Sequence, residues 1–451
     1  MRRLIAAVAL VACSSPEADP APTRPAGWHV ARGFVRDPDG RAVILRGVNV
    51  GRKTAPYLDF HGPDDFRRIS QTWGMNAVRF LVFWTAIEPT KGVYDRAYLE
   101  KVAERMRWAR DAGLLVVVDA HQDLFGEPFG GDGAPRWACA EEHYEKYVPR
   151  TPWFLGYTDP HLQACVDGFW ASTALQDSLA GALVEVAKTL RDNEAVIGFE
   201  PMNEPHWGSG AISAFEETKL QPFYERIVPK VRAAAPHWLA FLEPGANRNL
   251  GIPTRLQPLP FPNVVYAPHS YDGAAESGDG FNPAAQEVLA SNVAALRPEA
   301  DALGAALWIG EYGGDTSKPG IGAYMDGEYD GTGRVAGGQM YWIDGRDGGY
   351  ATHEADGSEK PVLLDAIVRP YPMRVAGDPV RWTHDRVGGV FTFVYRPDRS
   401  LPAPTEISLP ARAFPSPPKV DCGGCTFELE GNRLRITKPA AGEEVTVTVR
   451  R

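Results

Sequence analysis

Short apolar runs rich in β-branched and aromatic residues alternate with longer amphipathic segments between Val43 and Asp344. Runs of this length predict buried strands, and the segments between them predict helices. The predicted strands are 43–50, 76–84, 114–120, 196–203, 239–244, 264–270, 306–312 and 338–343, and the clearest predicted helices are 98–112, 174–191, 215–235 and 284–303. Eight strands alternating with helices predict the α/β class and, within it, a (β/α)8 TIM barrel.

The pattern changes after about Arg369. Strands of alternating polarity are predicted there at 389–396, 405–409, 426–429, 433–437 and 444–450, with Pro and Gly between them. Alternation of this kind is typical of an antiparallel sheet with one buried face. We therefore expect a catalytic barrel over residues 28–368 and a small C-terminal antiparallel β-sandwich over residues 369–451.

The N-terminus has the pattern of an export signal. Arg2 and Arg3 precede an apolar run, 4–12, that is too short to span a bilayer. Small residues before Cys13 resemble the lipidation box of bacterial lipoproteins, so a signal peptide at 1–12, a lipid on Cys13 and a tether at 13–27 are expected. The alternative is an ordinary signal peptide cleaved further on. The protein would be exported, as a lipoprotein at the membrane or as a secreted protein.

Composition and charge narrow the function classes. The chain has 451 residues, of which 44% are hydrophobic, so it can bury a large core in two folded units. Its formal net charge of −10 argues against a nucleic-acid partner, since no cluster of Lys and Arg stands out. We expect a monomer whose partners are a small substrate and, through the lipid, a membrane surface.

The five cysteines include one lipid acceptor and two local pairs. In an exported protein, Cys139 with Cys165 and Cys422 with Cys425 are expected to form disulfides. No second ligand pair lies near Cys422 and Cys425, so zinc is not expected and the chain is predicted to use no metal. The first pair brackets most of a long aromatic-rich segment, 121–173, which predicts a loop built over the barrel mouth.

Two glutamates close predicted barrel strands, at the end where barrels carry their active sites. Glu204 follows the fourth strand in Asn203-Glu204-Pro205, and Glu311 closes the seventh in Gly310-Glu311-Tyr312-Gly313. Glycoside hydrolysis needs two carboxyl groups, one protonated to release the leaving oxygen and one ionised to attack or to activate water. A single glutamate at a strand end is more often a surface or ion-paired residue, but other strands end in the same way.

Polar or aromatic residues close four further predicted strands. Arg79 closes the second, His121 the third, His269 and Tyr271 the sixth, and Trp342 the eighth. A packing requirement alone would favour Val, Ile or Leu at these places. The combination therefore indicates one active site at the carboxyl ends of the barrel strands.

These motifs resemble glycoside hydrolase family 5. Within residues 28–367, the stretches Leu45-Arg46-Gly47-Val48-Asn49, Asp119-Ala120-His121-Gln122-Asp123, Gly133-Ala134-Pro135-x-Trp137 and Phe169-Trp170 are similar to its endoglycoceramidase branch, which cleaves between glycan and ceramide and carries a C-terminal sandwich. The resemblance implies retention of configuration and no cofactor. It also implies that Glu204 is the acid/base and Glu311 the nucleophile.

The resemblance further implies substrate contacts. Asn203 would bind the sugar 2-hydroxyl, while Arg79 and Tyr271 would contact the nucleophile, which a positive Arg79 should keep ionised. Lys53, His121 and Asp123 would bind the other hydroxyls, although Lys53 and Asp123 could instead form a structural ion pair. Trp153 and Trp342 would offer ring faces to the sugar, and His269 would line the site.

The substrate expected from these features is a glycolipid or another β-glucoside. A lipid anchor and the aromatic residues between Trp137 and Trp170 favour a lipid aglycone held in an apolar groove. The same aromatic residues could instead form the core of the long loop. The alternatives are a glucosylceramidase or steryl-β-glucosidase, an endo-β-1,4-glucanase and, in a different class, a carbohydrate-binding lipoprotein without activity.

Overall fold

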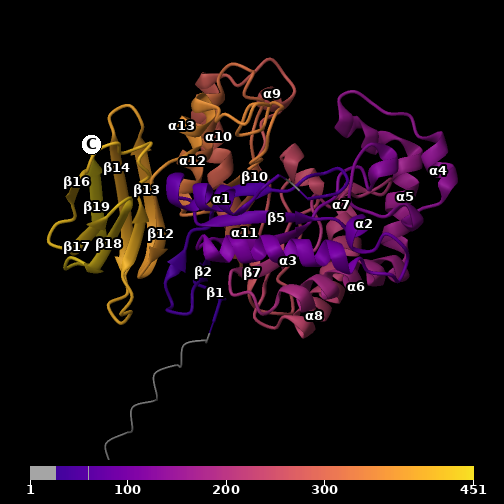
Figure 1. Cartoon of the computed structure of the whole chain (residues 1–451), viewed down its shortest axis with the longest axis horizontal. Coiled ribbons are helices and arrows are strands. Elements are labelled where there is room, and N and C mark those ends of the chain that lie inside the picture. The colour runs from indigo at the N-terminus through magenta and orange to yellow at the C-terminus, as the bar shows by residue number, and fades with distance from the viewer. Residues whose placement is uncertain (1–26, 59) are drawn as a thin grey trace, which may run out of the picture.

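The computed structural model describes residues 27–58 and 60–451 of the chain; the predicted signal peptide, Cys13 and most of the predicted tether lie outside the described residues. A central barrel separates two additions at opposite ends of the molecule (Figure 1). A β-sandwich covers one end, and a helical lobe projects from the other. In the described part of the chain, no helix has the length and apolar character needed to cross a bilayer.

The barrel is closed by eight parallel strands, which confirms the predicted architecture. In barrel order they are β4 (Arg46–Val50), β5 (Ala77–Val82), β6 (Leu115–Ala120), β7 (Val196–Glu200), β8 (Leu239–Leu242), β9 (Val264–Tyr266), β10 (Ala306–Tyr312) and β11 (Gly338–Tyr341). Pairing of β11 with β4 closes the ring. Because all strands run the same way, their carboxyl ends meet at one mouth.

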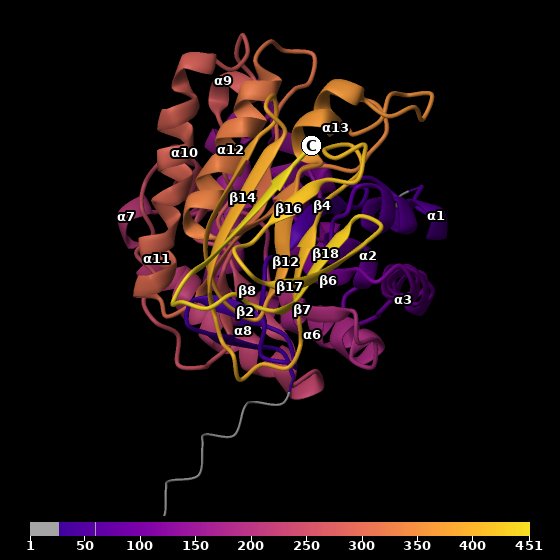
Figure 2. The same cartoon turned by 90° about the vertical axis from the view of Figure 1, so that its left-hand side faces the viewer.

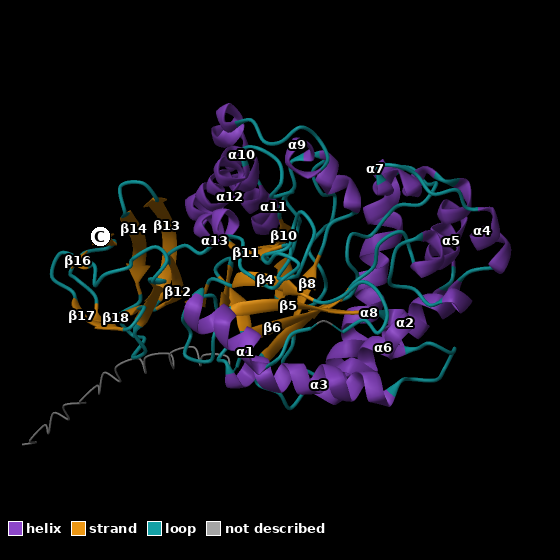
Figure 3. Ribbon diagram, turned by 45° about the horizontal axis from the view of Figure 1, so that its top comes forward, coloured by secondary structure: helices purple, strands orange, loops and turns teal. Residues whose placement is uncertain are grey.

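Helices surround the strands, as the turned view shows (Figure 3). Those of the barrel are α1 (Pro63–Arg67), η1 (Arg68–Thr72), α2 (Trp84–Ile87), α3 (Arg96–Asp111), α6 (Thr173–Leu190), α7 (Ile212–Phe215), η5 (Glu216–Leu220), α8 (Gln221–Ala234), η6 (Ala246–Leu250), α9 (Gly273–Glu276), η7 (Pro283–Ala285), α10 (Gln286–Ala294), α11 (Leu296–Ala302), α12 (Ile321–Val335) and α13 (Pro361–Ile367). The helix predicted at 284–303 is divided after Ala294. Pro298 explains the break, since a proline ring clashes with the carbonyl four residues earlier.

The lobe is built from the long segment after β6. It contains η2 (Glu127–Phe129), η3 (Arg136–Ala138), α4 (Glu141–Lys146), η4 (Trp153–Thr158) and α5 (Pro160–Ala171). The predicted disulfide between Cys139 and Cys165 is present and joins Cα atoms 5.5 Å apart. Most of the aromatic residues pack inside the lobe, with Tyr144, Phe169 and Trp170 buried. The burial of these residues agrees with the alternative that aromatic residues form the core of the long loop, because a loop of this length needs a core of its own.

The sandwich consists of two antiparallel sheets, seen face-on in Figure 2. One has the order β1-β2-β3-β12-β15-β18-β17 and the other β13-β14-β19-β16. The strands are β1 (His29–Ala31), β2 (Phe34–Arg36), β3 (Ala42–Val43), β12 (Tyr371–Val375), β13 (Gly377–Asp385), β14 (Val390–Pro397), β15 (Thr405–Ser408), β16 (Lys419–Asp421), β17 (Thr426–Glu430), β18 (Arg433–Lys438) and β19 (Val445–Arg450). Trp382, Phe391 and Phe393 form part of a separate buried core between the sheets.

The larger sheet takes strands from both ends of the chain. Val43 of β3 pairs with Arg374 of β12, so the residues before the barrel extend a C-terminal sheet. An ion pair between Arg36 and Asp378 crosses the same junction. The sequence prediction assigned residues 28–43 to the barrel domain alone, and it missed this pairing because the partners are far apart in the chain.

The predicted disulfide between Cys422 and Cys425 is wrong, since both residues are free thiols. Gly423 and Gly424 between them adopt positive φ angles and turn the chain. In this turn the Sγ of Cys425 lies 2.9 Å from the carbonyl oxygen of Cys422 instead of bonding to its sulfur. Burial raises the pKa of the Cys422 thiol to about 12, so it packs as a neutral apolar group.

Candidate active site

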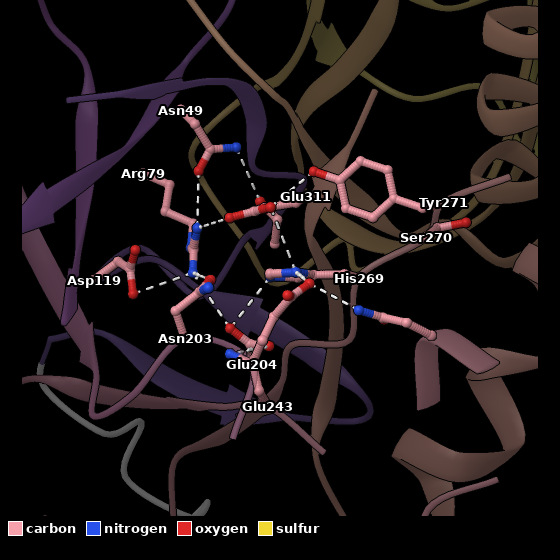
Figure 4. A network of polar contacts seen from close by, with 12 residues as sticks. Asn49, Arg79, Asp119, Asn203, Glu204, Glu243, His269, Ser270, Tyr271 and Glu311 are labelled. Carbon is pink, nitrogen blue, oxygen red and sulfur yellow. Dashed lines mark hydrogen bonds and ion pairs between the residues drawn. The ribbon is translucent and has the colours of Figure 1, made fainter. Parts of the chain in front are cut away.

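Arg79 is the centre of a buried polar network at the barrel mouth (Figure 4). It lies in the middle of β5 and not at the strand end, where the sequence pattern had placed it. Its guanidinium contacts Asn49, Asp119, Glu200, Asn203, Glu243 and Glu311. A guanidinium presents five N–H donors in a fixed fork, so one side chain can orient groups from several strands.

Glu311 is held on two sides. Its Oε1 accepts a hydrogen bond of 2.5 Å from Arg79, and its Oε2 accepts one of 2.8 Å from the Tyr271 hydroxyl. Burial raises the pKa of the Glu311 carboxyl, while the positive charges of His269 and Arg79 oppose this rise. Arg79 therefore favours the ionised form of Glu311, as expected. The effect of burial on the pKa of Glu311 is larger.

Glu204 lies opposite Glu311. Its Oε1 lies 2.8 Å from Nδ1 of His269 and accepts a 2.7 Å hydrogen bond from Asn249. One carboxylate oxygen of Glu204 and one of Glu311 lie within 4.8 Å of each other. The backbone of Glu204 has a φ of 39°, a strained conformation for a residue with a side chain. Strain of this kind is common at functional sites.

His269 carries charge between the two glutamates. Burial alone would lower the pKa of its imidazole, but the carboxyl groups of Glu243 and Glu311 outweigh burial and raise that pKa well above its usual value. Nε2 of His269 lies 3.2 Å from Oε1 of Glu243. The histidine is therefore expected to be positively charged and to link the surrounding carboxyl groups.

Three acidic residues of this network were not predicted. Asp119, Glu200 and Glu243 are buried and contact Arg79. Burial raises the pKa of Asp119 and Glu243. Burial also acts to raise the pKa of Glu200, but the charge of Arg79 and hydrogen bonds with Arg79 and Glu243 together lower it. A signal was present, because an acidic residue within or directly after an apolar strand is unusual unless it is paired. Asn49, on β4, was missed as well.

Lys53, His121, Asp123 and Trp342 lie together at another side of the mouth. Lys53 forms an ion pair with Asp123 and lies 4.6 Å from the ring centre of Trp342. The rings of His121 and Trp342 stack with centroids 5.1 Å apart. Asp119 orients His121, whose Nδ1 lies 2.7 Å from Oδ2 of Asp119. The predicted structural ion pair is thus present, and it sits among groups suited to bind a sugar.

Unsatisfied polar atoms mark this side as a binding surface. Nε2 of His121 and Oδ1 of Asp132 are buried without a hydrogen-bond partner in the described structure. Burial raises the pKa of the Asp132 carboxyl well above its usual value. Such groups are costly unless a ligand or water pairs with them. Asp132, absent from the predicted site, therefore belongs with His121 and Asp123.

Three of these side chains are of types that bind metal ions. His121, Asp123 and Asp132 bring potential ligand atoms within 4.8 Å of one another. In this cluster the ammonium group of Lys53 forms an ion pair with Asp123. In a second acidic cluster, Glu200, Glu243 and Glu311 form ion pairs with Arg79 or His269. Positive charge is thus supplied by the protein itself at both places.

Trp153 differs from the other predicted residues. It lies on η4 with 51% of its surface exposed, and its described ring contact is with Phe154. None of its described contacts joins it to the network around Arg79. The structure therefore brings together Arg79, Asn203, Glu204, His269, Tyr271 and Glu311 in one group, and Lys53, His121, Asp123 and Trp342 in a second group linked to the first by Asp119.

Two family models match the chain. The cellulase model of glycosyl hydrolase family 5 matches residues 37–331, and the model of the glycoside hydrolase family 5 C-terminal domain matches residues 369–449. Among curated relatives, endoglycoceramidase I of Rhodococcus hoagii is 29% identical over 454 residues, which cover 94% of this chain and 87% of that protein. A glucosylceramidase of Aspergillus fumigatus is 28% identical over 38% of this chain and 31% of its own length.

Solved structures agree with these matches. Endo-glycoceramidase II from Rhodococcus sp., in complex with ganglioside GM3, superposes with a TM-score of 0.82 at 30% identity, covering 92% of this chain and 99% of that one. A lactosyl-enzyme intermediate of the same enzyme superposes with a TM-score of 0.80. Sterylglucosidase 1 of Cryptococcus neoformans has a TM-score of 0.78 at 17% identity, covers 95% of this chain and 97% of that one, and shows a common fold.

Proposed function

The chain belongs to glycoside hydrolase family 5, and we propose that it hydrolyses the β-glucosidic bond between the glycan and the lipid of a glycolipid. It is a retaining glycoside hydrolase. The observation that carries the proposal is the pair formed by Glu204 and Glu311, with carboxylate oxygens within 4.8 Å of each other. Retaining enzymes need carboxyl groups about 5 Å apart because the nucleophile attacks directly and no water fits between them.

The contacts support distinct roles for the two glutamates. Glu311, held by Arg79 and Tyr271, attacks the anomeric carbon while Glu204 gives its proton to the leaving oxygen. The glycosyl-enzyme ester is then attacked by water, from which Glu204 takes a proton, and Glu311 leaves as a carboxylate. The sugar product keeps its β configuration because the anomeric carbon is inverted twice.

The remaining predicted residues fit contacts to the sugar. Asn203, which is oriented by Arg79, binds the 2-hydroxyl. Lys53, His121 and Asp123 bind the other hydroxyls of the glucose next to the scissile bond, and Trp342 offers its ring face to the sugar C–H groups. The unpartnered atoms of His121 and Asp132 support this assignment, because hydroxyl groups would satisfy them.

Apolar groups beside Glu204 support a lipid aglycone. Asn249, which donates to Glu204, precedes Leu250, and that leucine is 68% exposed. A small, largely buried apolar pocket is lined in part by Gln122, Phe125 and Met202, and the Gln122 amide donates to the carbonyls of Asn203 and Glu204. The lobe adds Trp153, Phe154 and Leu155, all with large exposed areas. Exposed apolar groups beside a polar site suit an amphipathic substrate.

Export and lipidation remain part of the proposal. Cys13 lies outside the described residues, so support comes from the sequence pattern of residues 1–13 alone. A lipid on Cys13 would hold the enzyme at a membrane and raise its effective concentration near lipid-embedded substrates. We expect the enzyme to act as a monomer without nucleic-acid partners.

A second candidate is a glucosylceramidase that releases a single glucose, favoured by the partial match to the Aspergillus fumigatus enzyme. Products released from glucosylceramide, lactosylceramide, a ganglioside and a soluble β-1,4-glucan distinguish the candidates, with Glu311→Ala as the inactive control. The proposed function expects an intact oligosaccharide from lactosylceramide and the ganglioside, with the β anomer formed first in NMR spectra. Release of glucose from glucosylceramide alone favours the second candidate, and cleavage of the glucan alone contradicts both.

A further inference from the structure

Glu328 is a fully buried carboxyl group outside the catalytic network. It lies on α12, and its exposed fraction is 0%. Its Oε1 is 2.8 Å from the hydroxyl of Ser270, while its Oε2 is buried without a hydrogen-bond partner in the described structure. An ionised carboxylate with a single hydrogen bond is very unfavourable in such a place, whereas a neutral carboxylic acid is tolerated.

The surroundings of Glu328 offer it no counter-charge. Among the described residues, no Lys, Arg or His forms an ion pair with it, and the charged group that shifts its pKa is the like-charged Asp272. The titratable groups that face it are Asp272 after β9, Tyr312 on β10 and Tyr324 on its own helix. Burial raises the pKa of Glu328 to about 8, Ser270 opposes the rise and Asp272 adds to it. The side chain therefore carries its proton at neutral pH.

Ser270, which contacts this carboxyl group, lies beside the proposed catalytic pair, and its side chain points away from the network (Figure 4). It lies between His269, which contacts Glu204, and Tyr271, which donates to Glu311. Its backbone N–H donates to the carbonyl oxygen of Glu311 at 2.9 Å. A shift of Ser270 would thus move two side chains that touch the reacting carboxyl groups.

We propose that Glu328 is a positioning residue that works as a neutral acid, holding Ser270 and thereby His269 and Tyr271, and that on ionisation at alkaline pH the buried carboxylate, which has no counter-charge, moves toward solvent, breaks its hydrogen bond to Ser270 and lowers activity. The proton is lost to solvent. The activity part rests on the glycosidase reaction proposed above. Glu328 touches neither substrate nor the catalytic carboxyl groups, and it acts through Ser270.

The test compares the full chain with Glu328→Gln, which keeps the shape of the side chain but cannot ionise. The measurement is kcat/KM against pH on a dinitrophenyl β-glycoside, whose leaving group departs without the proton of Glu204. The wild type should lose activity above a pH of about 8. The Gln variant should match it within about twofold at pH 7 and lack this loss. A Gln variant with the same alkaline loss overturns the proposal and points to His269 or Lys53.

Ser270→Ala provides a second variant. This variant lacks the hydroxyl through which Glu328 is proposed to act, so its kcat/KM should be lower than that of the wild type at pH 7 and should lose the alkaline drop, as in Glu328→Gln. An unchanged pH profile in this variant would contradict the link between the two residues.

A stability measurement tests whether Glu328 is neutral in the folded protein, and its result does not depend on the proposed function. The folded state holds the proton of Glu328 up to a pH of about 8, whereas the unfolded chain releases it near pH 4.3. The wild type should therefore lose stability relative to Glu328→Gln as pH rises between these values. Melting temperatures of both proteins at several pH values report this without any substrate. A difference in melting temperature that does not change with pH counts against a neutral Glu328.

Discussion

The catalytic network and the lobe lie on the same barrel but are held together in different ways. Arg79 lies within a barrel strand, its partners lie on or just after the neighbouring strands, and charged hydrogen bonds fix them in a buried setting. The lobe is held by apolar packing and one disulfide, and it leaves Trp153, Phe154 and Leu155 exposed. Strands position reacting groups accurately, whereas loops can change without disturbing them. The network thus suits the chemical step, and the lobe suits recognition of the aglycone.

The largest expected effect comes from the catalytic pair. Glu311→Ala should lower kcat by at least about a thousandfold on lipid and soluble substrates alike, because both need the same nucleophile. Azide or formate should restore turnover and give a product of inverted configuration. Glu204→Ala should spare an activated aryl glycoside, which needs no acid. Equal losses on activated and unactivated glycosides in Glu204→Ala would contradict these roles.

The second effect concerns the disulfide of the lobe. The bond joins residues separated by 26 positions, so Cys139→Ser with Cys165→Ser should destabilise the lobe by about 3 kcal/mol. Proteolysis should then cut within 121–173 before the barrel unfolds. Hydrolysis of a soluble aryl glycoside should remain within about twofold of the wild type, since no hydrogen bond or ion pair of the described residues joins Cys139 or Cys165 to the network around Arg79. A comparable loss on soluble and lipid substrates would show that the two regions are coupled.

The smallest effect should come from the exposed surface of the lobe. Trp153→Ala combined with Phe154→Ala should lower kcat/KM on a ceramide glycoside by about tenfold, because less apolar surface remains to contact the lipid. A soluble glycoside with the same glycan should be hydrolysed unchanged. Val387→Ala is the matched control, since this valine is 94% exposed on the sandwich at the opposite end of the molecule. An equal loss of kcat/KM on the soluble glycoside would indicate that Trp153 contacts the glycan, as the family resemblance implies.

Local pattern was enough to determine the barrel and the positions of the two glutamates proposed as catalytic. Eight apolar runs separated by helical segments have few stable arrangements, and parallel strands bring their carboxyl ends to one mouth. Residues at the carboxyl ends of those strands or just after them, such as Glu311 and Glu204, therefore had to lie near one another. Their identities as carboxyl groups restricted the chemistry.

Only the tertiary structure decided which groups surround that pair. Arg79 appeared to close a strand, and Glu200 appeared as part of an apolar run, yet both meet inside the barrel with a 2.5 Å contact. Pairing of Val43 with Arg374 and the approach of Glu328 to Ser270 likewise join distant segments. Such contacts depend on how whole elements pack and on the cost of leaving buried polar groups unpaired, and neither is encoded in the periodicity of a single segment.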